Sequence, residues 1–350
     1  QQQRLAYHAD PVPTLAQRRA DLEALKALIR DNEAALVDAV NADYGSRCRF
    51  ETRFSEILMV LEDIARTKKQ LKKWLKPQKR HIDRLLFPTS SCRVIPQPVG
   101  VVGIIVPWNF PIMLSLAPVV AAFAAGNRAM VKMSENSAHL SQLLSKLSAK
   151  YFPADKLAFF SDDNGSGPAF SAQPFDHLFF TGSAQTGRAV MANAAKNLTP
   201  VTLELGGKSP VVIMPDVDVA TAAPGAAGAI FFNSGQVCVA GSRLYVHDSI
   251  FDRVVEGTAG AASGMGLETA RLFASNGWYV GGVDVNTDGL RALEQEPDLS
   301  IEELASRACL SLYHFHRVFT AGAGEAPGEM CRRLRMQRAA WQLCYTDASV

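Results

Sequence analysis

The stretch VGVVGIIVPWNFPIMLSLAPVVAAFAAG, residues 99–126, decides which class of fold this chain adopts. Its length and apolar character are those of a membrane-spanning helix. Prolines interrupt it at positions 107, 111 and 118, and a spanning helix rarely tolerates such breaks. We therefore expect a buried strand, then the loop VPWNFP, then a buried helix over 112–125.

The chain downstream repeats this alternation of strand and helix. Apolar runs predict strands at NRAMVK, KLAFFS, DHLFFTG and VTLELGG, and helical patterns cover 137–150 and 184–197. Near-continuous apolar strands separated by helices are typical of a parallel sheet covered on both faces. The sequence therefore predicts an α/β fold with a Rossmann-like parallel sheet, preceded by helices over 13–42 and 54–76.

A second set of elements follows this predicted sheet. We expect a helix between Asp218 and Phe232, the strand SRLYVH and a short helix over 249–256. A proline costs about 3 kcal/mol inside a helix, so the regular part of the first helix is predicted to begin at or after Pro224.

Composition and charge narrow the class of protein. The chain has 350 residues, 48% hydrophobic and 20% charged, which is enough for two or three domains. Its net charge of +2 favours neither nucleic acid nor a membrane as a partner. A basic run from Arg66 to Arg84 closes an amphipathic helix, and we interpret it as a solvated face rather than a polyanion site.

The cysteines and the first residue bear on cellular location. The six cysteines, at positions 48, 92, 238, 309, 331 and 344, show neither a CxxC pair nor metal-ligand spacing. This pattern predicts a reduced, cytoplasmic protein without a metal site. The first residue is Gln1 rather than Met, which indicates that the natural start lies further upstream.

Three residues have the chemistry of a nucleophilic site. Cys238 follows a Gly-Gln turn at a helix end, where backbone amides can surround a thiolate. Glu204 ends an apolar strand, so its carboxylate is expected in the crevice beyond the carboxyl ends of the strands. Asn109 lies in the loop after the first strand, where its amide can donate to an oxyanion. Taken singly, a buried structural cysteine and a paired carboxylate remain the alternatives.

Two further stretches suit a dinucleotide. MVKMSE places Lys132 and Glu135 at the end of a strand. FFTGSAQTGR leads from a strand through Gly182 and Ser183 into a helix that contains Gly187. Backbone amides at such a helix N-terminus suit a pyrophosphate.

With these motifs in this order, residues 1–256 resemble the first half of the aldehyde dehydrogenase superfamily. The separation of 34 positions between Glu204 and Cys238 also fits that family. PQPVGVVGIIVPWNFP and AFSAQPFDHLFFTGS resemble its coniferyl aldehyde dehydrogenase branch. The resemblance implies an NAD(P)-dependent oxidation of an aldehyde, with an aromatic, coniferyl-type substrate favoured, and a homo-oligomer, a dimer in particular.

The resemblance also implies roles for the residues. The Cys238 thiolate attacks the aldehyde, Asn109 and the Cys238 amide hold the oxyanion, and Glu204 activates water to hydrolyse the thioester. Glu135 would repel a 2′-phosphate, which favours NAD, although the charge of Lys132 leaves NADP possible. The residues assigned to the cofactor are Trp108, Lys132, Glu135, Gly182, Ser183, Gly187 and Leu205.

Complete members of this family continue well past the catalytic cysteine. They carry a Glu-x-Phe-Gly-Pro-like motif that fixes the nicotinamide ribose, and this sequence has none. We therefore expect weak or no turnover. We also expect an exposed apolar sheet edge at SRLYVH, which favours abnormal association.

The last hundred residues resemble two other families. Residues 257–297 resemble the start of a short-chain dehydrogenase, with Gly260, Gly264 and Gly266 in a loop and Asp284 after the next strand. The catalytic Tyr-x-x-x-Lys is absent, so we interpret this fragment as inert.

Residues 298–345, within the C-terminal segment 298–350, resemble an AraC-type helix-turn-helix. Tyr313, His316 and Arg317 share one face of its recognition helix. The segment from 298 to 350 balances six arginines against four glutamates and two aspartates, which argues against binding to nucleic acid.

Three functions therefore compete. They are an aldehyde dehydrogenase, a nucleotide-binding but inactive composite of unrelated fragments, and a DNA-binding regulator. The first two differ only in turnover, and the charge balance of the C-terminal segment argues against the third.

Overall fold

The computed structural model describes residues 1–45, 47–162 and 165–265, and the chain forms two compact units. The first unit comprises Gln1–Asp43 and Cys48–Gly206. The second comprises Tyr44, Gly45, Arg47 and the described residues from Gly207 to Met265. None of the helices in the described ranges is both long and apolar enough to cross a membrane.

A five-stranded parallel sheet forms the centre of the first unit, with the strand order β5-β4-β3-β6-β7. The strands are β3 (Val101–Ile105), β4 (Arg128–Lys132), β5 (Leu157–Phe160), β6 (His177–Gly182) and β7 (Val201–Leu205). Each matches an apolar run in the sequence. The predicted α/β fold with a Rossmann-like parallel sheet is therefore confirmed.

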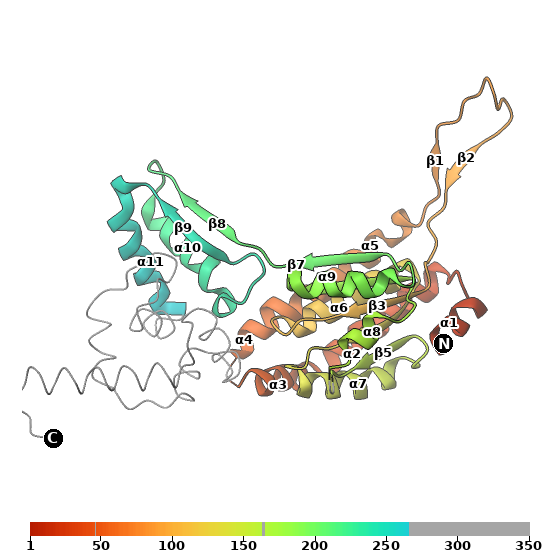
Figure 1. Cartoon of the computed structure of the whole chain (residues 1–350), viewed down its shortest axis with the longest axis horizontal. Coiled ribbons are helices and arrows are strands. Elements are labelled where there is room, and N and C mark those ends of the chain that lie inside the picture. The colour runs from red at the N-terminus through yellow and green to blue at the C-terminus, as the bar shows by residue number, and fades with distance from the viewer. Residues whose placement is uncertain (46, 163–164, 266–350) are drawn as a thin grey trace, which may run out of the picture. The chain divides into compact units, whose positions relative to one another are not determined.

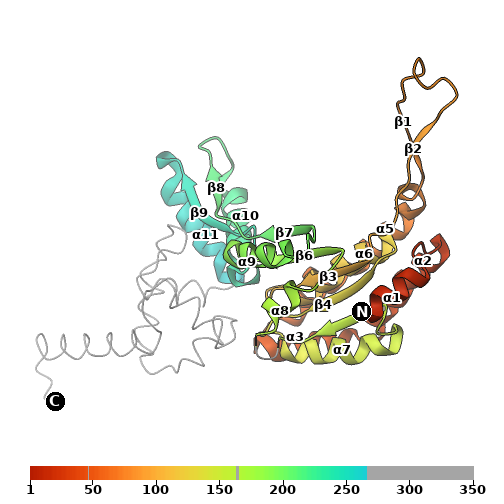
Figure 2. The same cartoon turned by 45° about the vertical axis from the view of Figure 1, so that its right-hand side comes forward.

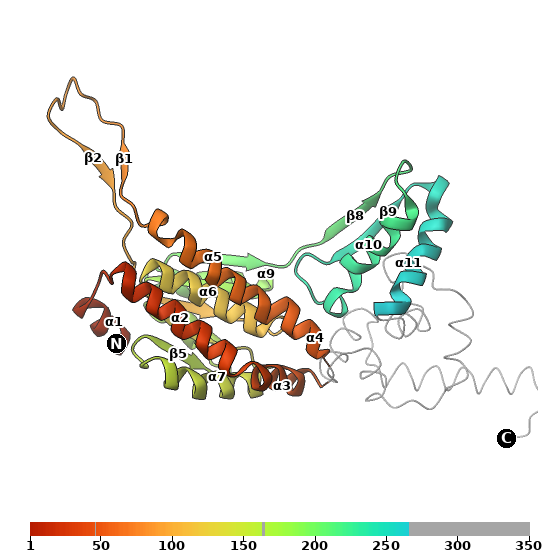
Figure 3. The same cartoon turned by 180° about the vertical axis from the view of Figure 1, so that it is seen from behind.

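Helices cover both faces of this sheet. Two connecting helices and two N-terminal helices form one layer, which Figure 3 shows from outside. They are α6 (Pro111–Ala125), α7 (Ala138–Tyr151), α2 (Leu15–Asp31) and α5 (Met59–Trp74). The opposite face carries α8 (Gly167–Ser171) and α9 (Ala184–Ala195). Parallel strands need such crossovers, and their right-handed connection directs the two halves of the sheet to opposite layers.

The helical region predicted over 13–42 consists of two helices. The helix α2 begins with a capping box between Thr14 and Gln17 and ends at Asp31, and α3 (Glu33–Tyr44) follows as a separate helix. Asn32 separates them, and its side chain donates to the carbonyl oxygen of Leu28 at 2.8 Å. Asparagine favours such local hydrogen bonds over a continued helix.

The N-terminal region also contains shorter elements. They are α1 (Gln2–Ala9), α4 (Arg49–Thr52) and the π-helix η1 (Arg53–Leu58), which runs directly into α5. A hairpin of β1 (Gln78–Arg80) and β2 (Cys92–Val94) follows α5 and extends away from the rest of this unit (Figures 1 and 2). Lys72 and Lys73 are exposed in the last turn of α5, as the amphipathic pattern predicted.

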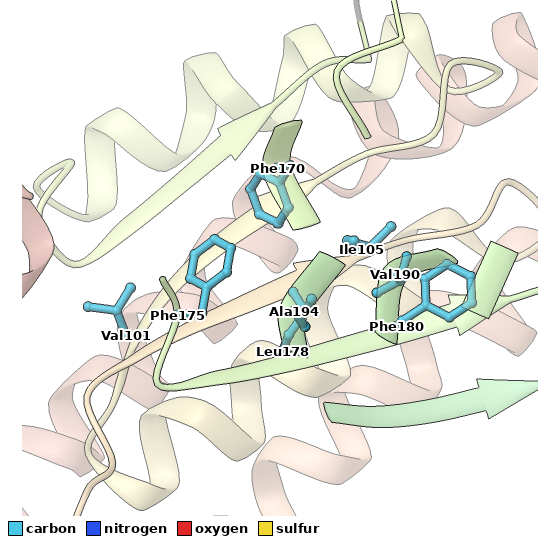
Figure 4. Packing of buried hydrophobic residues seen from close by; sticks show 8 residues of the cluster. All are labelled: Val101, Ile105, Phe170, Phe175, Leu178, Phe180, Val190 and Ala194. Carbon is cyan, nitrogen blue, oxygen red and sulfur yellow. The ribbon is translucent and has the colours of Figure 1, made fainter. Parts of the chain in front are cut away.

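The central strand β3 is buried along all five of its residues. On one side it meets an apolar cluster between the sheet and the helices α8 and α9 (Figure 4). The cluster consists of Val101, Ile105, Phe170, Phe175, Leu178, Phe180, Val190 and Ala194. Gly103 makes this packing possible, because a Cβ atom there would lie 2.6 Å from Cε2 of Phe175 and 2.8 Å from Cδ1 of Leu178.

The second unit is a β-α-β arrangement. Its parallel strands are β8 (Ser209–Ile213) and β9 (Gly241–Val246), and its helices are α10 (Val219–Phe231) and α11 (Phe251–Met265). The 3₁₀ turn η2 (Phe232–Gly235) follows α10, and the 3₁₀ turn η3 (Asp248–Ile250) precedes α11. Its core contains Ile213, Val219, Ala223, Ala226, Ile250 and Val254. Val212 and Tyr245 pair across the two strands and are 61% and 52% exposed, so this small sheet presents an apolar face to solvent.

Two predictions for the second unit are wrong. The helix α10 begins at Val219, before Pro224, because the Asp218 side chain caps it by accepting from the backbone N–H of Ala220 and the hydroxyl of Thr221. Pro224 lies in its second turn. The short helix expected over 249–256 continues as α11 to Met265, so the loop predicted around Gly260 and Gly264 is helical. Gly266 and everything after it lie outside the described residues.

We predict that Gly103→Ala lowers the free energy of unfolding by about 1–3 kcal/mol, because the added methyl group has to displace Phe175 and Leu178. Urea unfolding followed by circular dichroism measures this difference. Gly225→Ala in α10 is the control, because its Cβ would enter open space. We expect it to be neutral or stabilising by up to about 1 kcal/mol. Equal effects of the two changes would contradict the packing described for β3.

His177 gives a prediction for pH dependence. Burial lowers the pKa of His177 below its ordinary value of 6.5, and its Nε2 lies 2.9 Å from Oγ1 of Thr202 on the neighbouring strand. The folded chain therefore favours the neutral ring, whereas the unfolded chain takes up a proton as the pH falls below 6.5. The stability that His177 contributes is present above that pH and is lost as the pH falls through the lowered pKa.

Accordingly, we expect the urea midpoint to decline less between pH 7.5 and pH 5.5 in His177→Gln than in the wild type. A decline of the same size in both proteins would show that His177 does not contribute to acid sensitivity.

Candidate active site

The strand register brings the carboxyl ends of the central strands together. Ile105 pairs with both Lys132 and Phe180, and Thr181 pairs with Glu204. The loops that follow β3, β4, β6 and β7 therefore leave from one edge of the sheet, with neighbouring strands about 4.8 Å apart. The chain order reverses between β3 and β6, and ligands in open α/β sheets bind at such a switch point.

Trp108 and Asn109 occupy the loop between β3 and α6, where both are half-buried. The start of this loop is held to β4, because the backbone N–H of Val106 donates to the carbonyl oxygen of Lys132 at 3.0 Å. This places Asn109 where the sequence predicted, one loop beyond the first strand.

A buried carboxylate holds the far end of the same loop. Oε2 of Glu56 accepts hydrogen bonds from the backbone N–H groups of Ile112 at 2.6 Å and Met113 at 3.1 Å, in the first turn of α6. These N–H groups have no partner within the helix, and the positive end of the helix dipole favours the carboxylate. Glu56 was not singled out from the sequence. The pattern that could have identified it is an acidic residue on the apolar face of a helix.

Lys132 ends β4 and is buried beside a second acidic residue that sequence reasoning missed. Its Nζ forms an ion pair with Asp162, which follows β5, and the two side chains are 6% and 10% exposed. Burial alone raises the pKa of Asp162, but the hydrogen bond and charge of Lys132, together with hydrogen bonds from Ser166, outweigh this effect and lower it. Asp162 is therefore a carboxylate that neutralises Lys132.

Glu135 lies three residues beyond β4 and is exposed. Its carboxylate accepts from the hydroxyl of Ser134 at 3.2 Å. Lys132 and Glu135 are thus both at the carboxyl end of β4, as predicted.

The N-terminus of α9 follows β6 directly. Oγ of Ser183 accepts from the backbone N–H of Thr186 at 3.2 Å and so caps the helix, whose first turn is uncharged. Gly187 is buried against β7, and a Cβ atom there would lie 3.0 Å from Cδ2 of Leu205. This close approach brings the open helix end against the edge of the sheet.

These residues fit a dinucleotide. The capped N-terminus of α9 offers amide donors and positive dipole to a pyrophosphate. Oγ1 of Thr181, next to Gly182, is buried and has no hydrogen-bond partner among the described residues. Buried polar groups are normally satisfied, so an unpaired hydroxyl at this edge is consistent with a polar ligand.

Glu204 and Leu205 end β7, and both are exposed. Glu204 pairs with Thr181 in the sheet, so its backbone lies one strand away from the start of α9. Its carboxylate is accessible to water, as a general base requires.

Cys238 belongs to the second unit, and its thiol is exposed. It follows a strained stretch in which Asn233 and Ser234 have φ values of 49° and 54° and Gly235 has 72°. Non-glycine residues rarely adopt this left-handed conformation, and such strain concentrates at functional sites. A turn closed by the N–H of Ala240 and the carbonyl of Val237 at 3.0 Å presents Cys238.

The first unit thus gathers nine of the ten predicted site residues at the carboxyl edge of its sheet. They are Trp108, Asn109, Lys132, Glu135, Gly182, Ser183, Gly187, Glu204 and Leu205. Cys238 lies in the second unit, so its approach to Asn109 and Glu204 stays a prediction.

Comparison with known proteins establishes the family. Residues 8–271, more than half of the chain, match the model of the aldehyde dehydrogenase family. The chain therefore belongs to the aldehyde dehydrogenase family, whose members use NAD(P). The match runs beyond residue 256 and includes the glycines at 260, 264 and 266, so part of the segment likened to a short-chain dehydrogenase falls inside it.

Several relatives are close in sequence. The chain is 46% identical over 238 residues to a "Probable coniferyl aldehyde dehydrogenase" of Pseudomonas aeruginosa strain PAO1. The matched segment covers 68% of this chain and 50% of the relative. It is 41% identical over 238 residues to a coniferyl aldehyde dehydrogenase of Pseudomonas sp. strain HR199, covering 68% and 49%. The chain spans about half the length of the curated relatives it matches.

Solved structures agree with the fold. A substrate-bound Staphylococcus aureus AldH superposes with a TM-score of 0.73 at 27% identity, covering 79% of this chain and 63% of that one. PnpE in complex with nicotinamide adenine dinucleotide superposes with a TM-score of 0.67 at 26% identity, covering 80% and 60%.

We predict that Glu56→Ala lowers the free energy of unfolding by about 1–3 kcal/mol, because it leaves one buried and one partly buried backbone donor at the start of α6 without this acceptor. Glu56→Gln should cost less, since its amide oxygen still accepts. Exposed Glu62 on α5 is the control, and Glu62→Ala should stay within about 0.5 kcal/mol of the wild type. Denaturant unfolding of the three variants tests this order, and a Glu56→Ala protein as stable as Glu62→Ala would refute it.

Proposed function

We propose that this chain binds NAD(P) at the carboxyl edge of its first unit and oxidises an aldehyde to a carboxylic acid through Cys238. The observation that carries the proposal is the gathering of the predicted cofactor and base residues at one edge of the parallel sheet, at its switch point. Membership of the aldehyde dehydrogenase family supports the same chemistry.

The reaction begins with the Cys238 thiolate, which attacks the aldehyde carbonyl carbon. The amide of Asn109 and the backbone N–H of Cys238 donate to the developing oxyanion, which lowers the barrier to addition. When bound, NAD(P) accepts the hydride that leaves this adduct. Glu204 then takes a proton from water, the water attacks the thioester carbonyl, and the thiolate leaves as the acid forms.

The first unit positions the cofactor. The N-terminus of α9, with Gly182 and Ser183, would hold the pyrophosphate, while Lys132 and Glu135 would read the adenosine ribose. Gly187 and Leu205 would shape the floor of this site, and Trp108 would line the nicotinamide or substrate side. The negative charge of Glu135 favours NAD over NADP.

Two finer proposals follow from the relatives. Two of them are named as coniferyl aldehyde dehydrogenases, which favours an aromatic aldehyde as the substrate. A dog relative that is 34% identical is named a dimeric, NADP-preferring aldehyde dehydrogenase, which favours a homodimer. The exposed side chains of Leu85, Leu86 and Phe87, between β1 and β2, are consistent with a covered surface in such a dimer, and light scattering would measure its mass.

The catalytic cysteine is tested by acylation. Wild-type protein mixed with 4-nitrophenyl acetate should release a burst of about one equivalent of nitrophenolate, because acylation of an accessible thiolate is faster than hydrolysis of the acyl-enzyme. Cys238→Ala should abolish the burst, whereas Cys92→Ala, which removes another exposed thiol, should preserve it.

Absorbance at the NADH band with coniferyl aldehyde and with an aliphatic aldehyde then measures turnover. NADH formation lost in Cys238→Ala supports the proposal. A burst without NADH supports the alternative, a nucleotide-binding composite without turnover. A burst that survives in Cys238→Ala would rule out this residue as the nucleophile.

A further inference from the structure

The ion pair between Lys132 and Asp162 lies where a dinucleotide-binding sheet distinguishes its cofactors. The strand β4 is next to β3 and is the second strand of this sheet along the chain, and the residues at its carboxyl end read the adenosine ribose in folds of this type. Lys132 is the last residue of β4, and its side chain ends in an ammonium group. A 2′-phosphate on that ribose would need a cation at this position.

The ammonium group of Lys132 is already paired with the carboxylate of Asp162. Its Oδ2 contacts Nζ of Lys132, and its Oδ1 accepts from the hydroxyl of Ser166 at 2.9 Å. A Cβ atom on Gly167 would lie 3.6 Å from Nζ of Lys132, so the backbone at the start of α8 also approaches the ammonium. Both charged side chains are at least nine-tenths buried, and this burial limits screening by solvent.

The local charge balance disfavours a second phosphate. Lys132 contributes one positive charge, Asp162 and Glu135 contribute two negative charges, and the sum is negative before any cofactor binds. A 2′-phosphate adds about 1.5 to 2 negative charges at neutral pH. A ribose with a free 2′-hydroxyl adds none.

We propose that Asp162 is a specificity-determining residue that excludes NADP by neutralising Lys132, so that the site selects NAD. This inference rests on the proposed function, because it needs the adenosine ribose to lie at the end of β4. It also distinguishes the roles of Asp162 and Glu135. Glu135 is exposed and repels a phosphate through solvent, whereas Asp162 neutralises the buried ammonium group that would bind this phosphate.

The test compares the dissociation constants of NAD and NADP by isothermal titration calorimetry, without a turnover assay. In Asp162→Asn the side chain keeps its shape and an oxygen for Ser166, but Lys132 loses its counter-charge. We expect the ratio of Kd for NADP to Kd for NAD to fall roughly ten- to hundredfold, because a charge-assisted hydrogen bond to the 2′-phosphate becomes available. The Kd for NAD itself should change less than about threefold.

Asp21→Asn is the matched control. It breaks another partly buried Lys–Asp pair of the same unit, in which Nζ of Lys156 lies 2.6 Å from Asp21, with side chains 13% and 25% exposed. Lys156 immediately precedes β5, at the amino ends of the strands and away from the proposed site. We expect the ratio of the two dissociation constants to stay at the wild-type value in this variant.

A double-mutant cycle tests whether Asp162 acts through Lys132. In a Lys132→Met background, Asp162→Asn should leave the ratio unchanged, because no ammonium remains to be freed. A ratio that falls as far in this background as in the wild type would overturn the proposed mechanism of selection.

The remaining outcomes are also decisive. An unchanged ratio in a folded Asp162→Asn protein means that the pair is structural only and refutes the inference. If Asp162→Asn does not fold, Asp162→Ser and the wild type still test it, since a wild type that binds NADP as tightly as NAD would equally refute it. Failure of the wild type to bind either dinucleotide would instead refute the proposed function.

Discussion

The burial of β3 on both faces is the constraint on which the rest of the first unit depends. A strand with five buried residues has to pair its backbone on both sides, and β4 and β6 supply these partners in parallel. Parallel partners require helical crossovers, which leave β3 toward one layer and β6 toward the other. The switch point between these two strands, and hence the edge that collects the site residues, is a geometric result of burying VVGII.

The same burial explains the unequal sizes of the residues packed there. Gly103 sits under Phe175 and Leu178, where any side chain would collide with them. A large aromatic ring over a glycine fills the layer between the sheet and α8 without displacing the strand. The helix α9 repeats this device with Gly187 against Leu205, and it thereby brings its N-terminus close to the sheet.

Much of the first unit could be predicted from its sequence, because apolar runs of strand length and helical periodicity report burial directly. Each of the five strands matched such a pattern, and so did the connecting helices α6, α7 and α9. Residues whose roles depend on contacts distant along the chain were missed. Asp162 meets Lys132 across 30 positions and Glu56 meets Ile112 across 56, and no periodic pattern encodes such pairs. Local capping also overrode propensity, since Asp218 starts α10 ahead of Pro224 and Asn32 divides the long N-terminal helix.

The candidate site was predictable to a similar degree. Strand ends fixed the positions of Asn109, Lys132, Glu135, Gly182 and Glu204, because parallel strands place their carboxyl ends together. Cys238 was recognised by its motif rather than by any sheet, and the structure adds that consecutive left-handed residues precede it. No local pattern could reveal that Lys132 has a buried partner. The pair of Lys132 and Asp162 presents no net charge to a ligand, whereas Lys132 alone would present a positive one.

The hydrogen bonds of Glu56 also carry a consequence for how the protein is made. Glu56 is synthesised 56 residues before Ile112, so at about 5–20 residues per second the ribosome completes the acceptor several seconds before its donors. The N-terminal helices can therefore form first and offer a carboxylate to α6 as that helix emerges. The loop that carries Asn109 can then be held between β3 and a helix that is capped from its first turn.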